Sequence, residues 1–135
     1  MGISEAEFAV LKNRKVAANW RQRARGLTNH RRGEMTKAEA MYDQELAVMK
    51  AAGLIEWYAY ESATFKLGVD ARYTPDFMVM LADGTLEAVD VKGGGMVQEA
   101  SMVRIRAFAL QFPIRMVIAT LQKNGGFERK EINGN

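Results

Sequence analysis

The amino-acid sequence predicts an α/β fold of the mixed α+β kind, in which a central mixed β-sheet is flanked by helices. Segments with the apolar spacing of helices are interspersed with short runs rich in β-branched and aromatic residues. Their order is helix, helix, two strands, a hairpin, helix, strand and edge strand, which favours helices packed on a sheet. With 135 residues, of which 48% are hydrophobic, the chain is large enough for one domain with a buried core.

The composition excludes several kinds of site. The chain contains no cysteine and a single histidine, His30. Disulfides, thiolate zinc sites, cysteine nucleophiles and multi-histidine metal centres are therefore excluded, and a serine–histidine triad is disfavoured. No apolar run approaches the roughly 20 residues that span a bilayer, and the early acidic residues Glu5 and Glu7 do not fit a signal peptide. We expect a soluble, cytoplasmic protein without a membrane partner.

The N-terminal part of the chain is predicted to form a basic helix over residues 4–25 and a polar loop over 26–35. Residues 1–37 contain nine Lys and Arg against three acidic residues, and such segments often bind nucleic acid. The helix could instead be merely solvated, cover the core, or pack on a second subunit. We therefore separate an arm or dimer contact (1–35) from a core domain (36–135). The basic side chains expected to contact DNA are Lys12, Arg14, Lys15, Arg21, Arg23, Arg25, Arg31 and Arg32, together with Arg104 from a later helix.

A second helix is predicted over residues 36–52. Thr36 and Glu39 have the spacing of a capping box, and Gly53 suits the position after a helix end. Apolar residues at helical spacing, among them Tyr42, form its expected inner face. Glu39 lies on that side as well, and its spacing alone favours a capping role over a role as a metal ligand.

The next segments are predicted to be strands. Residues 54–60 and 63–67 are rich in aromatic and β-branched side chains, and a loop over 68–72 follows them. A hairpin is predicted over 73–93, with a tight turn at Asp83–Gly84. Asp83 is assigned to the turn and not to a site.

Strand alternation sorts the charged residues of the hairpin, because successive side chains point to opposite faces. In the first strand it places Asp76 on the face opposite to Phe77. In the second strand Asp90 and Lys92 lie together on one face, whereas Glu87 points to the other and is left out of the site. Two carboxylates and a lysine thus meet on an otherwise apolar hairpin.

The remaining chain is predicted to contain a glycine hinge at 93–95, a helix over 98–112 ended by Pro113, a buried strand over 114–121 and an edge strand over 127–132. The glycine run lacks the following Lys-Ser/Thr of a nucleotide-binding loop. The apolar residues expected along the helix are Val103, Ile105, Ala107, Phe108, Leu110 and Phe112, with Arg106 facing solvent.

The charged residues of the hairpin suit the hydrolysis of a phosphodiester. Mg²⁺ prefers oxygen ligands and often takes only one or two carboxylates. We therefore expect Asp76 and Asp90 to bind it, with the backbone carbonyl of Val91 as a further oxygen. Such an ion activates water and neutralises charge on the phosphoryl group. Lys92 is assigned an electrostatic role, because neighbouring carboxylates favour its protonated form.

The residues around these carboxylates resemble a known motif. The sequence Tyr-Thr-Pro-Asp-Phe ending at Phe77, followed by Asp-Val-Lys-Gly at 90–93, is similar to the Pro-Asp…(Asp/Glu)-x-Lys signature of the PD-(D/E)XK nuclease superfamily. Thr-Lys-Ala-Glu, ending at Glu39, is similar to the sequence around the glutamate on the first core helix of those enzymes. Over residues 36–120 the order of elements resembles small phage nucleases, including Holliday-junction resolvases of the endonuclease I type.

The resemblance implies a restriction-endonuclease-like core with Glu39, Asp76, Asp90 and Lys92 as the active centre. It also implies one or two Mg²⁺ ions, for which Mn²⁺ often substitutes. It favours a role for Glu39 as a metal ligand or as a residue that orients a ligand over a purely capping role. Two features depart from the family pattern: the triple glycine after Lys92, and Arg104 where an accessory lysine or glutamine is usual. These departures leave the choice of substrate open.

The expected function is therefore that of a metal-dependent DNA endonuclease of phage or prophage origin, acting in the host cytoplasm on duplex or branched DNA. Resolution of a junction requires two active sites, and hence a symmetric homodimer. The alternative is a non-catalytic module that retains the nuclease fold and binds DNA or another protein.

Overall fold

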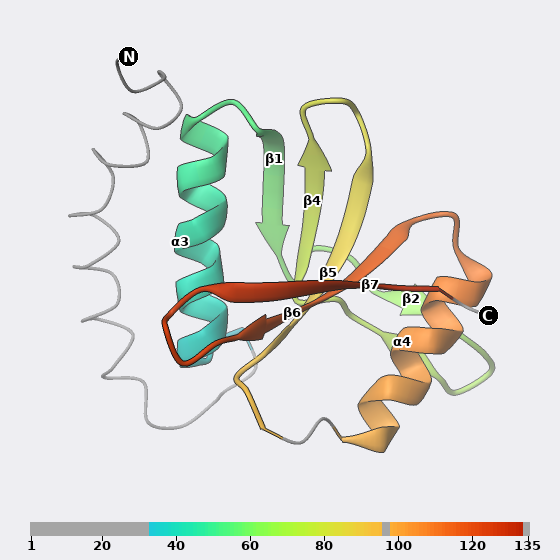
Figure 1. Ribbon diagram of the computed structural model, residues 1–135. Coiled ribbons are helices and arrows are strands. Elements are labelled where there is room, and N and C mark those ends of the chain that lie inside the picture. Colours follow the sequence, from blue (N-terminus) through green and yellow to red (C-terminus); the bar gives the residue numbers. More distant parts are fainter. Residues whose placement is uncertain (1–32, 96–97, 134–135) are drawn as a thin grey trace, which may run out of the picture.

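Residues 33–95 and 98–133 are described by a computed structural model, which Figure 1 shows as a ribbon. They form an α+β fold with a mixed five-stranded sheet and two helices, in agreement with the predicted class. The helices are α3 (Lys37–Ala51) and α4 (Glu99–Gln111), and the strands are β1 (Ile55–Tyr60), β2 (Phe65–Lys66), β3 (Arg72–Tyr73), β4 (Phe77–Leu81), β5 (Leu86–Lys92), β6 (Arg115–Leu121) and β7 (Phe127–Ile132).

Strand β5 lies at the centre of the sheet, whose order is β1-β4-β5-β6-β7. Strands β4 and β5 form the predicted hairpin, with Phe77 opposite Val89. In its turn the Asp83 carboxylate accepts the N–H of Thr85 at 2.8 Å, which confirms Asp83 as a turn residue. The pairing of β5 with β6 is parallel, whereas the other pairings in this sheet are antiparallel. Helix α4 makes the crossover that parallel neighbours require.

The two faces of the sheet pack against different helices, which Figure 1 shows on opposite sides of the strands. Alternation along the strands divides the apolar side chains between these faces. On one face Phe77 packs with Tyr42 and Leu46 of α3, and on the other Ile105 and Phe108 of α4 are fully buried. The charged residues of the hairpin that are discussed below lie near the start of β4 and the end of β5, which are adjacent because these two strands are antiparallel.

Several local predictions are wrong. The expected strand over 63–67 is shorter. Arg72, assigned to a loop, and Tyr73, assigned to the first strand of the hairpin, form β3, which pairs with β2 in a separate two-stranded sheet, and the hairpin strand β4 begins only at Phe77. In α4, Val103 and Leu110 are 60% and 67% exposed. They lie off the buried stripe because this stripe runs through residues three or four apart, which are Met102, Ile105, Phe108, Ala109 and Phe112. Arg106 is exposed, as predicted.

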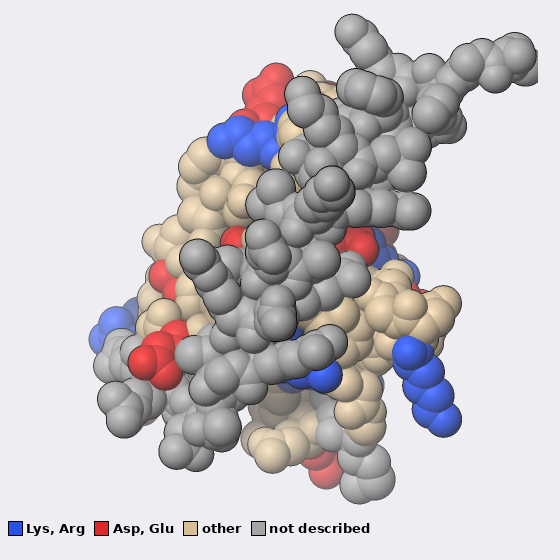
Figure 2. All heavy atoms as spheres, turned by 90° about the vertical axis from the view of Figure 1, so that its left-hand side faces the viewer, with Lys and Arg blue, Asp and Glu red and all other residues tan. Residues whose placement is uncertain are grey.

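The predicted basic helix and loop over residues 4–32 lie outside the described residues, and so do the eight basic side chains expected there to contact DNA. On the α3 side of the molecule, basic and acidic side chains are interspersed over the described surface that Figure 2 leaves visible. In the described part of the chain, neither helix is long and apolar enough to cross a lipid bilayer.

Candidate functional site

The first wall of the site is the N-terminal turn of α3. The Thr36 hydroxyl accepts the N–H of Glu39 at 3.2 Å, and Oε1 of Glu39 accepts the N–H of Thr36 at 2.9 Å. This is a complete capping box, so the predicted capping role of Glu39 is confirmed. The other carboxylate oxygen, Oε2, accepts a hydrogen bond from the Tyr60 hydroxyl of β1 at 3.2 Å. Both oxygens of Glu39 are thereby fixed in position, and the side chain is only 5% exposed.

Asp76 lies immediately before β4, where the ladder between β4 and β5 ends at the pair Phe77 and Val89. Its Oδ2 accepts the N–H of Val91 at 2.7 Å, and its backbone carbonyl accepts the N–H of Glu61 at 2.8 Å. The carboxylate thus takes the place of a ladder carbonyl beyond the end of the paired region. Its direction is set by this hydrogen bond and not by strand alternation alone.

Asp90 and Lys92 lie on the face of β5 that α4 covers, as alternation predicted. Lys92 Nζ is 2.8 Å from Oδ2 of Asp90 and donates to Oγ of Ser101 on α4, also at 2.8 Å. The Tyr73 hydroxyl donates to Oδ1 of Asp90 at 3.0 Å. Among the described residues, Lys92 is the one polar partner of the buried Oδ2, which it approaches as an ion pair, and no other group donates a hydrogen bond to this oxygen. This oxygen therefore retains an unused lone pair.

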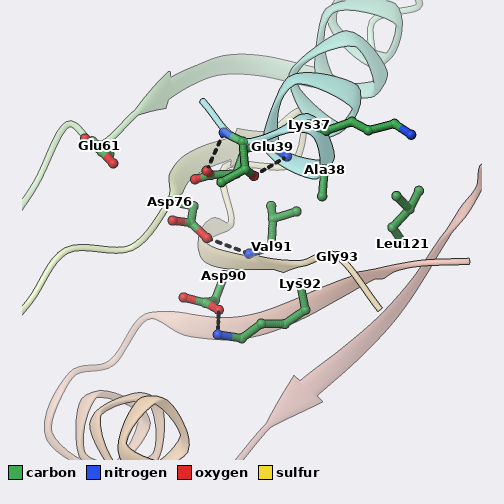
Figure 3. Close-up of a pocket in the computed structure, with 11 residues that line it drawn as sticks. Lys37, Ala38, Glu39, Glu61, Asp76, Asp90, Val91, Lys92, Gly93 and Leu121 are labelled. Carbon is green, nitrogen blue, oxygen red and sulfur yellow. Dashed lines mark hydrogen bonds and ion pairs between the residues drawn. The ribbon is translucent and has the colours of Figure 1, made fainter. Parts of the chain in front are cut away.

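Glu39, Asp76, Asp90 and Lys92 all line one cleft of about 590 Å³. Figure 3 shows the three carboxylates in a row, with Asp76 between the other two. A further carboxylate, Glu61, lines the same cleft and lies toward one end of it. The structure thus places the helix glutamate and the charged residues of the hairpin around one cleft. The other lining residues are Thr36, Lys37, Ala38, Val91, Gly93 and Leu121.

Burial and like charge act together on the carboxylates of this cleft. Desolvation raises the pKa of Asp76 well above its usual range, and the negative charges of Asp90 and Glu39 raise it further. Burial also raises the pKa of the Tyr73 hydroxyl beside Asp90 and that of the Tyr60 hydroxyl beside Glu39. Both tyrosines therefore stay protonated as hydrogen-bond donors. The excess negative charge must be offset by a bound cation or by a proton.

The available donors fit a hard divalent cation such as Mg²⁺. Asp76 and Asp90 offer two carboxylates, and Oδ2 of Asp90 has an unused lone pair. Across residues 33–95 and 98–133, no three or more His, Cys, Asp or Glu side chains form a ready-made metal cage. Mg²⁺ does not require one, because it commonly keeps several waters and binds one or two carboxylates. The Val91 carbonyl stays a predicted ligand.

Two charged residues that the sequence analysis discussed lie apart from the cleft. Glu87 points to the opposite face of β5, as predicted, and pairs there with Arg115 and Arg129. Arg104 is exposed on α4 and is not among the residues that line the cleft. Its contact with DNA stays a prediction.

Four residues that support the site were not identified from the sequence: Tyr60, Glu61, Tyr73 and Ser101. The partners of the two tyrosines and of the serine lie 9 to 21 residues away along the chain, so no local pattern reveals them. Glu61 is the one non-glycine residue with a positive φ, 45°, in the described part of the chain. Such a conformation is a mark of strain that often accompanies functional sites, and it has no signature in sequence.

Comparisons with known proteins give no family assignment. No family model matches the chain, and neither a curated protein nor a solved structure matches it at a significant level. The interpretation of the cleft therefore depends on its own residues and geometry.

Proposed function

We propose that the protein is a metal-dependent DNA endonuclease of the PD-(D/E)XK type, built on a restriction-endonuclease-like core. The observation that supports this most directly is the convergence of Glu39, Asp76, Asp90 and Lys92 on one cleft from three separate parts of the chain. Hydrolysis of a phosphodiester requires an activated water and positive charge near the phosphoryl oxygens. A row of carboxylates beside one fixed lysine meets both requirements once a divalent cation binds.

The cation assigned to this cleft is Mg²⁺, with Mn²⁺ as a substitute, and Asp76 and Asp90 would hold it. When bound, it would supply a water of lowered pKa and neutralise charge on the phosphoryl group. Lys92 is held by Asp90 and Ser101, each at 2.8 Å, so its ammonium is pre-positioned to stabilise developing negative charge. Glu39, fixed by Thr36 and Tyr60, limits the directions available to the neighbouring carboxylate of Asp76.

The substrate that we assign is DNA, either duplex or branched, and a phage origin with action on Holliday junctions is the narrower form of the proposal. Cleavage of both strands at a junction would require two copies of the cleft, and hence a homodimer.

The test is a cleavage assay with the purified full-length protein and Mg²⁺ on linear duplex, single-stranded and four-way-junction DNA. Asp90→Asn and Lys92→Ala should each lower the rate at least ~100-fold, the usual cost of losing one pre-positioned electrostatic contact. The matched controls are Asp70→Asn and Lys50→Ala, because both residues are exposed and neither lines the cleft. These controls should cleave like the wild type.

Two outcomes would overturn the proposal. One is wild-type rates for Asp90→Asn and Lys92→Ala, which would exclude this cleft as the active site. The other is a lack of cleavage of every substrate with either Mg²⁺ or Mn²⁺. If DNA still bound in that case, the result would favour the non-catalytic binding module.

A further inference from the structure

A second cleft, of about 620 Å³, adjoins the acidic cleft. The two clefts share Gly93 and Leu121 in their walls, so they lie next to each other and are together called the groove. Lys92 pairs with Thr120 in the parallel ladder, and these residues lie close to the C-terminal ends of β5 and β6. Ligands of open α/β sheets commonly bind outside this edge of parallel strands. The second cleft is lined by Gly93, Gly94, Gly95, Thr120, Leu121, Gln122 and Lys123.

One wall of the second cleft is bare backbone. Gly94 and Gly95 have φ values of +85° and +119°, which side chains rarely adopt. A Cβ on Gly94 would also come within 3.1 Å of the Leu121 carbonyl oxygen, so glycine is required where this segment passes the end of β6. Within the described residues, the N–H groups of Gly94 and Gly95 donate no hydrogen bond. Free backbone donors without side chains around them suit a close approach by anionic oxygens.

The charges along the groove are unevenly distributed. Figure 3 shows Glu61 at one end of the acidic cleft, whereas the Lys37 side chain extends in the opposite direction, toward the side on which Leu121 lies. Lys123 continues this basic side into the second cleft. Both lysines are exposed, and neither forms an ion pair with any residue in the described ranges. A polyanion is therefore repelled at the Glu61 end and attracted at the glycine end.

We propose that the second cleft binds the sugar–phosphate backbone of the cleaved strand on one side of the scissile bond only. The N–H groups of Gly94 and Gly95 and the Lys123 side chain in this cleft, together with Lys37 of the adjoining acidic cleft, make the contacts with its phosphates. This inference rests on the proposed nuclease function and adds a direction to it: the strand leaves the acidic cleft over the glycines and not past Glu61. The triple glycine, which departs from the family pattern, thereby acquires a role in substrate positioning.

The test uses the full-length protein and a DNA substrate that it cleaves, carrying one uncharged methylphosphonate at each position around the cut in turn. Neutralising a phosphate that occupies the second cleft should lower kcat/KM by ~10-fold, the equivalent of losing ~1.4 kcal/mol of binding to the transition state. Phosphates on the other side of the cut should be insensitive. In Lys123→Ala the penalty at the position that Lys123 contacts should become smaller, because both changes remove that contact while the backbone N–H groups remain.

Binding provides a second readout that does not depend on cleavage. Measured by fluorescence anisotropy without a divalent cation, the salt dependence of DNA affinity should become less steep in Lys123→Ala by ~0.7–0.9 in the log–log slope, as expected for one lost phosphate contact. Lys50→Ala, which removes an exposed lysine at the far end of α3, should keep both the slope and the methylphosphonate penalty.

Two results would overturn this inference while leaving the nuclease function intact. They are equal sensitivity to methylphosphonates on both sides of the cut, and a full penalty retained in Lys123→Ala. A wild-type protein that cleaves no DNA with Mg²⁺ or Mn²⁺ would overturn the nuclease function and this inference together.

Discussion

Strand β5 contains two buried acidic residues, three positions apart, whose surroundings differ. Glu87 is 2% exposed and faces the α3 side, where Arg115 and Arg129 approach its two oxygens at 3.3 and 2.5 Å. Asp90 is 6% exposed and faces the α4 side, where Lys92 is its one cationic partner in the described part of the chain and Asp76 is a like-charged neighbour. In the Glu87 cluster two arginines compensate one buried carboxylate. In the Asp90 cluster, among the described residues, a single lysine faces more than one carboxylate, so negative charge is left over.

This difference is the one expected between a charge that serves the fold and a charge at the proposed active site. A buried carboxylate with two arginines stabilises the fold once it is in place, because losing either partner leaves charge uncompensated. Crowded carboxylates with a single lysine destabilise the fold in the absence of a cation. Proteins retain such destabilising arrangements mainly where they bind or react with something.

The largest effect on stability is expected from Glu87→Gln. Removing this charge should lower the free energy of unfolding by ~1–3 kcal/mol, less than for a fully buried pair because both arginines are partly exposed. Urea denaturation measures the loss. Cleavage per folded molecule should stay at the wild-type level. If Glu87→Gln lost cleavage while keeping its stability, the conclusion that Glu87 serves only the fold would be wrong.

A smaller effect is expected from Mg²⁺ on the folded protein. At tenfold excess over its dissociation constant, an ion that binds only the folded state adds ~1.4 kcal/mol of stability, so Mg²⁺ should raise the Tm of the wild type. Asp76→Asn and Asp90→Asn should lose this increase, whereas Glu87→Gln and Asp70→Asn should keep it. Scanning calorimetry with Mg²⁺ and with EDTA gives the result. An unchanged increase in Asp90→Asn would place the ion elsewhere.

The smallest effect is expected from pH in the absence of divalent cations. The pKa of Asp76 is raised in the folded state, so its protonated form stabilises the fold at low pH and this contribution is lost as the pH rises. Asn cannot ionise, so Asp76→Asn does not undergo this loss. The free energy of unfolding of Asp76→Asn minus that of the wild type should therefore be ~1 kcal/mol larger at pH 8 than at pH 5. Urea titrations at the two pH values in EDTA measure this. If the variant and the wild type differed in stability by the same amount at both pH values, the negative charge of the cleft would already be offset without a divalent cation.

Local patterns predicted most of the fold and the central residues of the cleft. The capping box at Thr36 and the tight turn at Asp83 depend on neighbouring residues only, and both are confirmed. Alternation along β5 correctly grouped Asp90 with Lys92 because register fixes the face of every residue in a strand. By contrast, the hydroxyl partner of Asp90 comes from Tyr73, whose position depends on packing between distant segments. Sequence periodicity contains no information on such contacts.

The place of β5 in the middle of the sheet also has a consequence for synthesis of the chain. Every residue assigned to the active centre precedes Gly93, but the parallel neighbour β6 is made only after α4. Until then β5 presents an unpaired edge that includes Ala88 and Val89, both fully buried in the finished fold. A chain that stops at the glycines would expose this edge to association with other chains. A ribosome-bound or truncated chain would thus hold all of the carboxylates of the cleft and still be prone to aggregate, and the cleft would take shape only with the completed sheet.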